Sequence, residues 1–147
     1  MTTPIDLRLS GMWTRRLCWL AVPSVAACSL FDYESHRLDG PYELVAIDEP
    51  SQMHLAYDIG DGVSVGRVPA TVFAAGADAR HVIAKRHPGG DRTRTEWYIL
   101  VRARDSASAD PSASVVGPLT EAQFAAERER LGVAPSLDFT VVRRDLQ

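Results

Sequence analysis

Short apolar segments separated by turn residues fill the sequence between residues 42 and 103. Six of them are rich in β-branched and aromatic residues and are bounded by Gly, Pro or Asp: 42–47, 53–59, 63–65, 68–74, 81–85 and 97–103. Segments of this length are typical of strands, because helices in globular proteins usually run to about ten residues or more. The pattern therefore predicts a series of short strands joined by turns.

The apolar run over residues 97–101 contains no polar residue except the hydroxyl of Tyr98, as expected of a strand buried on both faces. Pairing of this segment with residues 81–85, across the loop 87–95, would make an antiparallel hairpin with a long connection. A closing strand is predicted over residues 137–142.

One helix is predicted in the C-terminal part, beginning after Thr120. Gln123 stands three residues further on and completes a capping box, and Glu121 places a negative charge in the first turn. Phe124 lies on the apolar side of this helix, and Gly132 supplies a left-handed residue that ends it.

These elements predict an α+β fold, a mainly antiparallel β-sheet with one C-terminal amphipathic helix packed on it. Residues 105–114 are Ser, Ala, Asp and Pro, a composition that indicates a mobile loop. The chain has 147 residues and is 46% hydrophobic, which suits one globular domain over residues 41–147.

An export signal is predicted over residues 1–27. Arg15 and Arg16 precede an apolar run over residues 17–27, the order of regions in a secretory signal. The run is shorter than the roughly 20 apolar residues of a transmembrane helix. A start at Met12 would leave this order unchanged. A twin-arginine signal and a buried N-terminal helix are the alternative interpretations.

The segment Val25-Ala26-Ala27-Cys28 resembles the lipobox of bacterial lipoproteins. That resemblance implies a diacylglyceryl group on the sulfur of Cys28 and cleavage just before it, with residues 28–40 as a lipid-anchored tether. It places the protein on the cell membrane or the outer membrane, facing the periplasm or the exterior. Cys18 would be removed with the signal, leaving no second cysteine for an intramolecular disulfide.

The charge of the domain argues against nucleic-acid binding. Removing residues 1–27, which carry three arginines and one aspartate, changes the net charge from −3 to −5. Sequence-independent binding to nucleic acid requires concentrated positive charge, so we expect no nucleic-acid partner.

Four further segments resemble a family of small bacterial lipoproteins known as domain of unknown function 3997. They are Gly-Pro-Tyr-Glu-Leu (40–44), His-Val-Ile-Ala-Lys (81–85), Trp-Tyr-Ile-Leu (97–100) and Gly-Pro-Leu-Thr (117–120) leading to Phe124. The sequence departs from the family in its shorter, Arg-rich loop over residues 86–94. The resemblance implies a location and a fold but no mechanism, because the family has no established activity.

The Arg-rich loop is the candidate partner-binding site. Arg86, His87, Arg92 and Arg94, with Gly89-Gly90 between them, form a flexible basic segment that could meet a phosphate, a lipid headgroup or an acidic partner. A solvated hairpin loop is the alternative. Lys85, at the end of its strand, is expected to extend its ammonium group to solvent.

No metal, cofactor or catalytic residue is predicted. The four histidines (His36, His54, His81 and His87) match no recognised ligand spacing. Ser64 lacks a nucleophile elbow, and Gly60, Gly62 and Gly66 precede no helix that could complete a phosphate loop. Asp58, Asp61, Asp78 and Glu96 could supply oxygens to calcium, but these residues do not form the D-x-[DN]-x-[DN]-G loop.

The expected function is that of a lipid-anchored envelope lipoprotein with a non-enzymatic binding or structural domain. Its partners would be the membrane, through the N-terminal lipid, and an envelope protein. Two alternatives remain open: a periplasmic immunity or inhibitor-type lipoprotein that blocks a partner enzyme, and a cryptic hydrolase whose residues meet only on folding.

Overall fold

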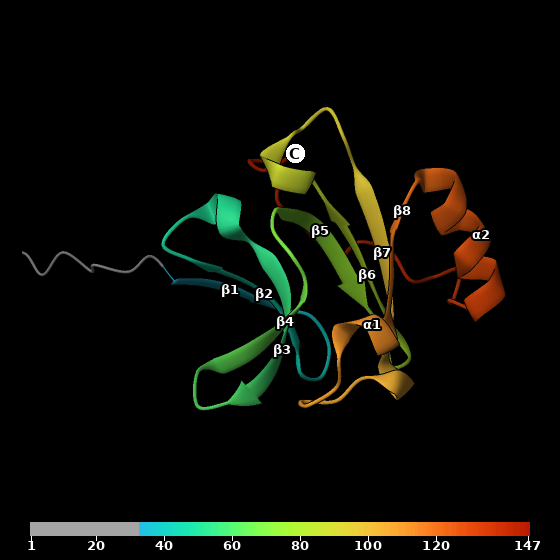
Figure 1. The fold of residues 1–147 in the computed structure, drawn as a ribbon, viewed down its shortest axis with the longest axis horizontal. Helices are drawn as coiled ribbons and strands as arrows, with labels where there is room; N and C mark the ends of the chain where they lie inside the picture. Colours follow the sequence, from blue (N-terminus) through green and yellow to red (C-terminus); the bar gives the residue numbers. More distant parts are fainter. Residues whose placement is uncertain (1–32) are drawn as a thin grey trace, which may run out of the picture.

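The computed structural model describes residues 33–147 (Figure 1). In chain order the elements, with η marking 3-10 turns, are β1 (Tyr33–Arg37), β2 (Tyr42–Ile47), η1 (Pro50–Gln52), β3 (His54–Gly60), β4 (Val63–Val68), β5 (Val72–Ala77), β6 (His81–Arg86), η2 (Pro88–Gly90), β7 (Glu96–Val101), η3 (Arg102–Arg104), α1 (Pro111–Ser114), β8 (Val115–Leu119), α2 (Glu121–Leu131) and β9 (Val141–Val142). The predicted signal over residues 1–27 and Cys28 lie outside the described residues. No helix within residues 33–147 is long and apolar enough to cross a membrane.

Residues 33–147 form two antiparallel sheets rather than one. The first sheet has the strand order β1-β2-β3-β4, and the second has the order β8-β7-β6-β5-β9. The prediction of a mainly antiparallel β structure is confirmed, with this correction. Pro69 follows β4 at the point where the chain leaves the first sheet for the second, and a proline cannot donate the backbone hydrogen bond that would continue a strand.

The largest hydrophobic cluster takes its side chains from both sheets, which lie beside each other in Figure 1. It takes Tyr42, Leu44, Ala46, Leu55 and Val68 from the first sheet, and Val72, Val82, Ala84, Tyr98 and Leu100 from the second. Burying a large apolar side chain contributes roughly 1.5–3 kcal/mol, so this shared layer provides most of the attraction between the sheets. A smaller cluster on the second sheet joins Ile83, Ile99, Phe124, Val133 and Leu137.

The predicted long-looped hairpin is confirmed. Strands β6 and β7 pair over six positions, with Lys85 opposite Trp97 and His81 opposite Val101. The long connection contains η2. The interior positions of both strands are buried because one face of the pair packs in the cluster between the sheets and the other face packs in the cluster around Phe124.

The predicted tether is partly wrong, because residues 33–37 form β1 and pair with β2. The segment Tyr-Glu-Ser-His-Arg is polar in composition, and its side chains are exposed or half-buried. An edge strand can be this polar because it needs only one hydrogen-bonded neighbour. The folded part therefore begins before Pro41.

The predicted loop over residues 105–114 is also corrected. Its last four residues form the short helix α1, whose first turn is capped by the Asp110 carboxylate accepting from the Ser112 amide. Asp105, at its start, has a side chain with no solvent exposure. Strand β8, which was not predicted, follows α1 and pairs with β7.

Of the predicted closing strand, only Val141–Val142 forms a strand, β9, which pairs with β5. The preceding residues cross directly over β5, where a Cβ atom on Gly76 would lie 1.9 Å from the Asp138 carbonyl oxygen. Only glycine permits this close approach of two backbones, which explains why β5 contains one in its interior.

The caps predicted for the C-terminal helix are confirmed. The Thr120 hydroxyl accepts from the Gln123 amide and the Gln123 side chain accepts from the Thr120 amide, while Gly132 ends α2 in the left-handed conformation. Figure 1 shows α2 on the side of the second sheet that faces away from the first.

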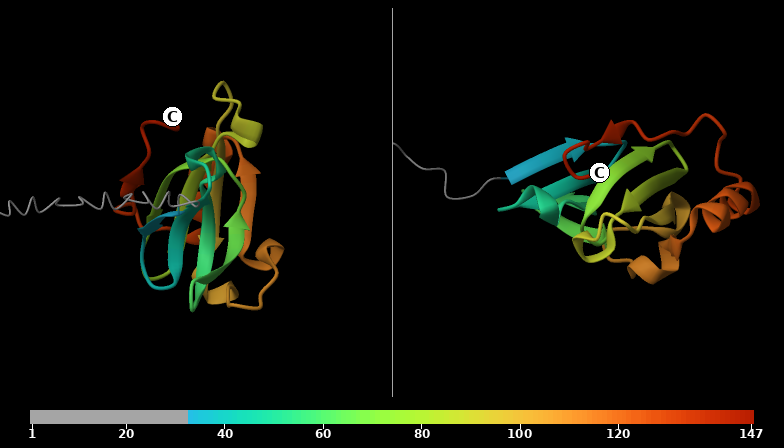
Figure 2. Two further views of the ribbon diagram at one scale, coloured as in Figure 1. Left: turned by 90° about the vertical axis from the view of Figure 1, so that its left-hand side faces the viewer. Right: turned by 90° about the horizontal axis from the view of Figure 1, so that it is seen from above.

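The N-terminal strand and the C-terminal segment lie side by side (Figure 2). Arg143, which follows β9, places its guanidinium 2.6 Å from the Glu34 carboxylate of β1 and 2.8 Å from that of Asp145. Its backbone amide donates to the Phe73 carbonyl of β5. Arg143 thus links β1, at the edge of the first sheet, to β5 of the second sheet beside its edge strand β9.

Candidate functional site

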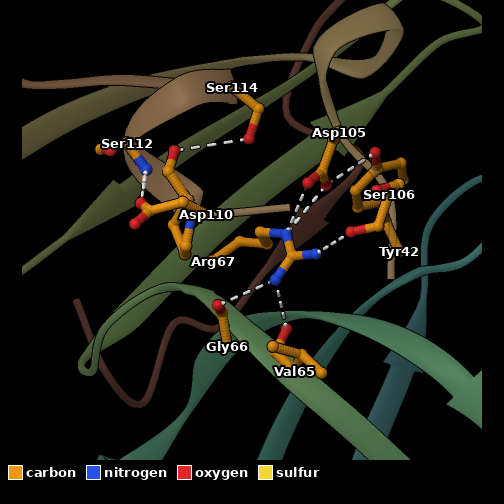
Figure 3. Close-up of polar contacts among 10 residues, drawn as sticks. Tyr42, Val65, Gly66, Arg67, Asp105, Ser106, Asp110, Ser112 and Ser114 are labelled. Atoms are coloured by element: carbon orange, nitrogen blue, oxygen red, sulfur yellow. Dashed lines mark hydrogen bonds and ion pairs between the residues drawn. The ribbon is translucent and has the colours of Figure 1, made fainter. Parts of the chain in front are cut away.

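A buried polar cluster connects the two sheets, and we call Tyr42, Arg67, Asp105 and the Ser106 carbonyl the inter-sheet cluster (Figure 3). The Arg67 Nε donates to both Asp105 carboxylate oxygens, at 2.8 and 2.9 Å, and one terminal nitrogen donates to the Ser106 carbonyl at 2.7 Å. The Tyr42 hydroxyl donates to the same carboxylate at 3.0 Å.

Water does not reach the charged groups of the inter-sheet cluster, because the side chains of Arg67 and Asp105 both have 0% exposure. The second terminal nitrogen of Arg67 points back to the Val65 and Gly66 carbonyls of its own strand. Burial, followed by the negative charge of Asp105, raises the pKa of Tyr42 above its ordinary value. With every group partnered and none accessible, the cluster can hold the sheets together but cannot touch a dissolved substrate.

The residues of the predicted basic loop are mostly engaged within the fold. Arg86 donates to the Glu96 carboxylate and to the Ala70 carbonyl, both at 2.9 Å. Arg92 donates to the Asp145 and Gln147 carbonyls at the C-terminus. Arg94 lies 3.8 Å from Glu96 with its side chain 68% exposed, so it is more open to a partner than Arg86, which is 16% exposed.

His87 turns into the core instead of facing a partner. Its ring stacks on Phe73 with 4.3 Å between centroids, and its Nδ1 lies 2.7 Å from the Arg94 carbonyl. A carbonyl only accepts, so Nδ1 carries a proton. Within residues 33–147 the buried Nε2 finds no hydrogen-bond partner.

Glu96 is the centre of a second polar cluster at the end of the β6–β7 hairpin. Burial acts to raise its pKa, but hydrogen bonds from Tyr98 and Arg86 outweigh burial and hold the pKa below its ordinary value. Burial, and then the bond to Glu96, raises the pKa of Tyr98 to about 12. Glu96 is therefore ionised and Tyr98 protonated at neutral pH.

Lys85 differs from the expectation that its ammonium group extends to solvent. The Nζ atom lies 4.0 Å from the ring centroid of Trp97 and 4.3 Å from that of Phe139, a cation–π arrangement on two ring faces. Burial lowers the pKa of Lys85, and the charges of Glu121 and Asp138 act in the opposite direction.

The remaining candidates are not brought together. No group of three or more His, Cys, Asp or Glu side chains within residues 33–147 is arranged to hold a metal ion. The candidate calcium ligands separate: Asp58 pairs with Arg37, Asp78 caps the turn before β6, and Glu96 pairs with Arg86.

The surface has open hollows rather than a deep cleft among the described residues. One, of about 450 Å³, lies where Gly66 leaves space beside His54, and its wall is completed by Gln52, Val68 and Pro69. Another, of about 400 Å³, is lined by Arg80, His81 and Arg102. Arg102 is already paired with Asp39, so this second hollow is less positive than its residues suggest.

Sequence reasoning missed the inter-sheet cluster. Arg67 lies between two apolar segments, where a charged residue is typical of a turn between strands. Asp105 is the first residue of a segment of small polar residues, which indicates a loop. The available signal was a lone arginine with apolar residues on both sides, which in a strand must find a buried partner.

One comparison with known proteins gives a match. A family model described as "Protein of unknown function (DUF3997)" matches residues 39–145, well over half of the chain. This confirms the resemblance noted in the sequence, while the match itself carries no information on lipid attachment. No curated protein and no solved structure matches the chain.

Replacing Asp105 with asparagine should destabilise the domain strongly. The substitution keeps the shape of the side chain but leaves the Arg67 charge buried without a counter-charge, which typically costs about 3–5 kcal/mol. The Tyr42→Phe control removes one hydrogen bond only and should cost about 0.5–2 kcal/mol. Urea unfolding would measure both, and a cost for Asp105→Asn no larger than that of Tyr42→Phe would contradict the assigned role.

His81 should make the stability of the domain fall below neutral pH. His81 is 4% exposed, and burial lowers its pKa below the ordinary 6.5, partly opposed by the charge of Asp78. The unfolded chain then binds the proton more readily than the folded one, so stability is complete above pH 6.5 and declines as the pH falls further.

Unfolding free energies between pH 7 and 5.5 test this for the wild type and for His81→Leu. The wild type should show the steeper decline, with a difference in slope of at most about 1.4 kcal/mol per pH unit, the limit for one proton. Equal slopes for the two proteins would show that His81 does not titrate in this way.

Proposed function

The chain belongs to the family of proteins of unknown function DUF3997, and we propose that it is a lipid-anchored bacterial envelope protein with a non-enzymatic binding or structural domain. The observation that carries the proposal is the order of basic residues, apolar run and small residues that ends at Cys28.

A binding or structural role is favoured by how the acidic groups are used. Glu34 accepts from Arg143 and His36, Glu96 accepts from Arg86 and Tyr98, and the pKa values of both are lowered. A general acid or base works best with a pKa near the operating pH. The pKa values of these two carboxylates are shifted further below neutral pH, as expected of groups that accept stabilising hydrogen bonds in the folded protein.

We also propose that α2 covers the second sheet as an amphipathic helix. Phe124, 4% exposed, supports this, because its ring centroid lies 4.8 Å from that of Trp97 in β7. Phe124 shares a cluster with Ile83 and Ile99, while Glu129 and Arg130 on the same helix are exposed.

The lipid anchor predicts that label from radioactive palmitate enters the protein only through Cys28. In a bacterial host that processes lipoproteins, the wild type should be labelled and Cys28→Ala should lose the label. Cys18→Ala is the matched control, because Cys18 lies in the segment expected to be removed, and it should be labelled like the wild type. Equal labelling of Cys28→Ala and the wild type would eliminate the anchor.

The covering role of α2 predicts a large cost for Phe124→Ala. Removing the ring would leave a cavity against Trp97, and such truncations cost about 3–5 kcal/mol. Glu129→Ala, at an exposed position of the same helix, should change stability by no more than about 0.5 kcal/mol. Thermal and urea unfolding would measure both variants, and similar values for the two would rule out the proposed packing.

A further inference from the structure

Two large apolar side chains stand exposed and adjacent at one end of the first sheet. Tyr33 is 56% exposed and Ile47 is 51% exposed, and the two are directly opposite in the antiparallel register of β1 and β2. Directly opposed strand residues have Cβ atoms about 4.5–5.5 Å apart. They therefore form one continuous apolar surface, which we call the Tyr33–Ile47 patch.

The Tyr33–Ile47 patch lies at the end of the domain that follows Cys28 in the chain. Five residue steps separate Cys28 from Tyr33, and a fully extended chain advances at most about 3.6 Å per residue. The patch therefore stays within roughly 18 Å of the anchored sulfur. A tether running to residue 40 would have let the folded domain lie more than twice as far from Cys28. Because β1 begins at Tyr33, the chain between Cys28 and the domain is shorter than that.

We propose that the Tyr33–Ile47 patch contacts the bilayer that holds the lipid anchor. This inference rests on the proposed function, because it requires lipid on Cys28. Tyrosine is enriched at membrane–water interfaces, where its ring is partly buried and its hydroxyl stays hydrated. The anchor also keeps the patch at a high effective concentration near the surface, so two side chains suffice for a populated contact.

The residues beside the patch specify the headgroup chemistry. Asp48 and Glu49 follow Ile47 and are exposed. Two carboxylates at the surface would be repelled by anionic lipids, so the contact suits zwitterionic headgroups such as phosphatidylethanolamine and phosphatidylcholine.

The contact would also set the orientation of the domain. Ile59 and Val63 flank the turn between β3 and β4 and are 48% and 52% exposed. Tyr57 lies opposite Tyr42, which places Ile59 about seven strand positions from Ile47, or roughly 23 Å at about 3.3 Å per residue. The β3–β4 turn would therefore point away from the membrane that the patch touches.

Lipid-quenched tryptophan fluorescence tests the proposal on the full lipid-bearing protein. Tyr33→Trp and, as the matched control, Ile59→Trp would be expressed in a lipoprotein-processing host, extracted and reconstituted into phosphatidylcholine–phosphatidylethanolamine vesicles, with and without bromine on the acyl chains. Ile47→Trp provides a second reporter in the patch. Trp97 gives the same background in each protein, because Trp13 and Trp19 lie in the segment expected to be removed.

Contact with the bilayer should shift the Tyr33→Trp emission to the blue in both kinds of vesicle, and the brominated lipids should quench it, while the Ile59→Trp emission stays unchanged. Adding phosphatidylglycerol should reduce the quenching. Absence of quenching at both positions 33 and 47, or equal quenching at 59, would overturn the proposed contact. Mass spectrometry of the same material distinguishes failure of the lipid anchor from failure of the patch contact. If the lipid is present but quenching is absent, this inference alone is overturned. If the lipid is absent, the proposed function is overturned together with it.

Discussion

The ion pair between Arg67 and Asp105 constrains how the two sheets can be arranged. Moving two charged groups out of water costs several kcal/mol each, and their mutual attraction offsets this cost only when the geometry and the remaining hydrogen bonds are satisfied together. Here β4 supplies the arginine, the connection after β7 supplies the aspartate and the Ser106 carbonyl, and β2 supplies the Tyr42 hydroxyl. Sheets displaced by one strand position would separate these groups, so the cluster favours a single alignment of an otherwise apolar interface.

The parts of this fold that follow from local chemistry could be predicted from the sequence. The boundaries of β2 and both caps of α2 depend on residues within a few positions of one another, and the pairing of β6 with β7 joins two segments that follow each other in the chain. Strand β1 could not be recognised, because an edge strand with one neighbour carries little hydrophobic pattern. The inter-sheet cluster could not be predicted either, since it joins residues 42, 67 and 105, whose proximity exists only after the sheets have packed.

The basic loop contains more arginine side chains than it leaves available to a partner. Arg86 is engaged by Glu96, and Arg92 by carbonyls near the C-terminus, which no local pattern indicates. Elsewhere in the described residues Arg102 meets Asp39, and Arg37 meets Asp58. The guanidinium group suits this use because its planar set of donors can satisfy several oxygens at once.

The contact between Arg143 and Glu34 brings the first strand of the domain beside its last residues. Neighbouring chain ends are what allow a protein to be circularly permuted with a short linker. A permuted chain with new ends at the exposed Asp61-Gly62 turn would keep both sheets. In that chain strand β1 would follow the new linker and would no longer be joined directly to Cys28. A reporter domain fused after Gln147 would, for the same reason, be held next to strand β1 rather than projected away from it.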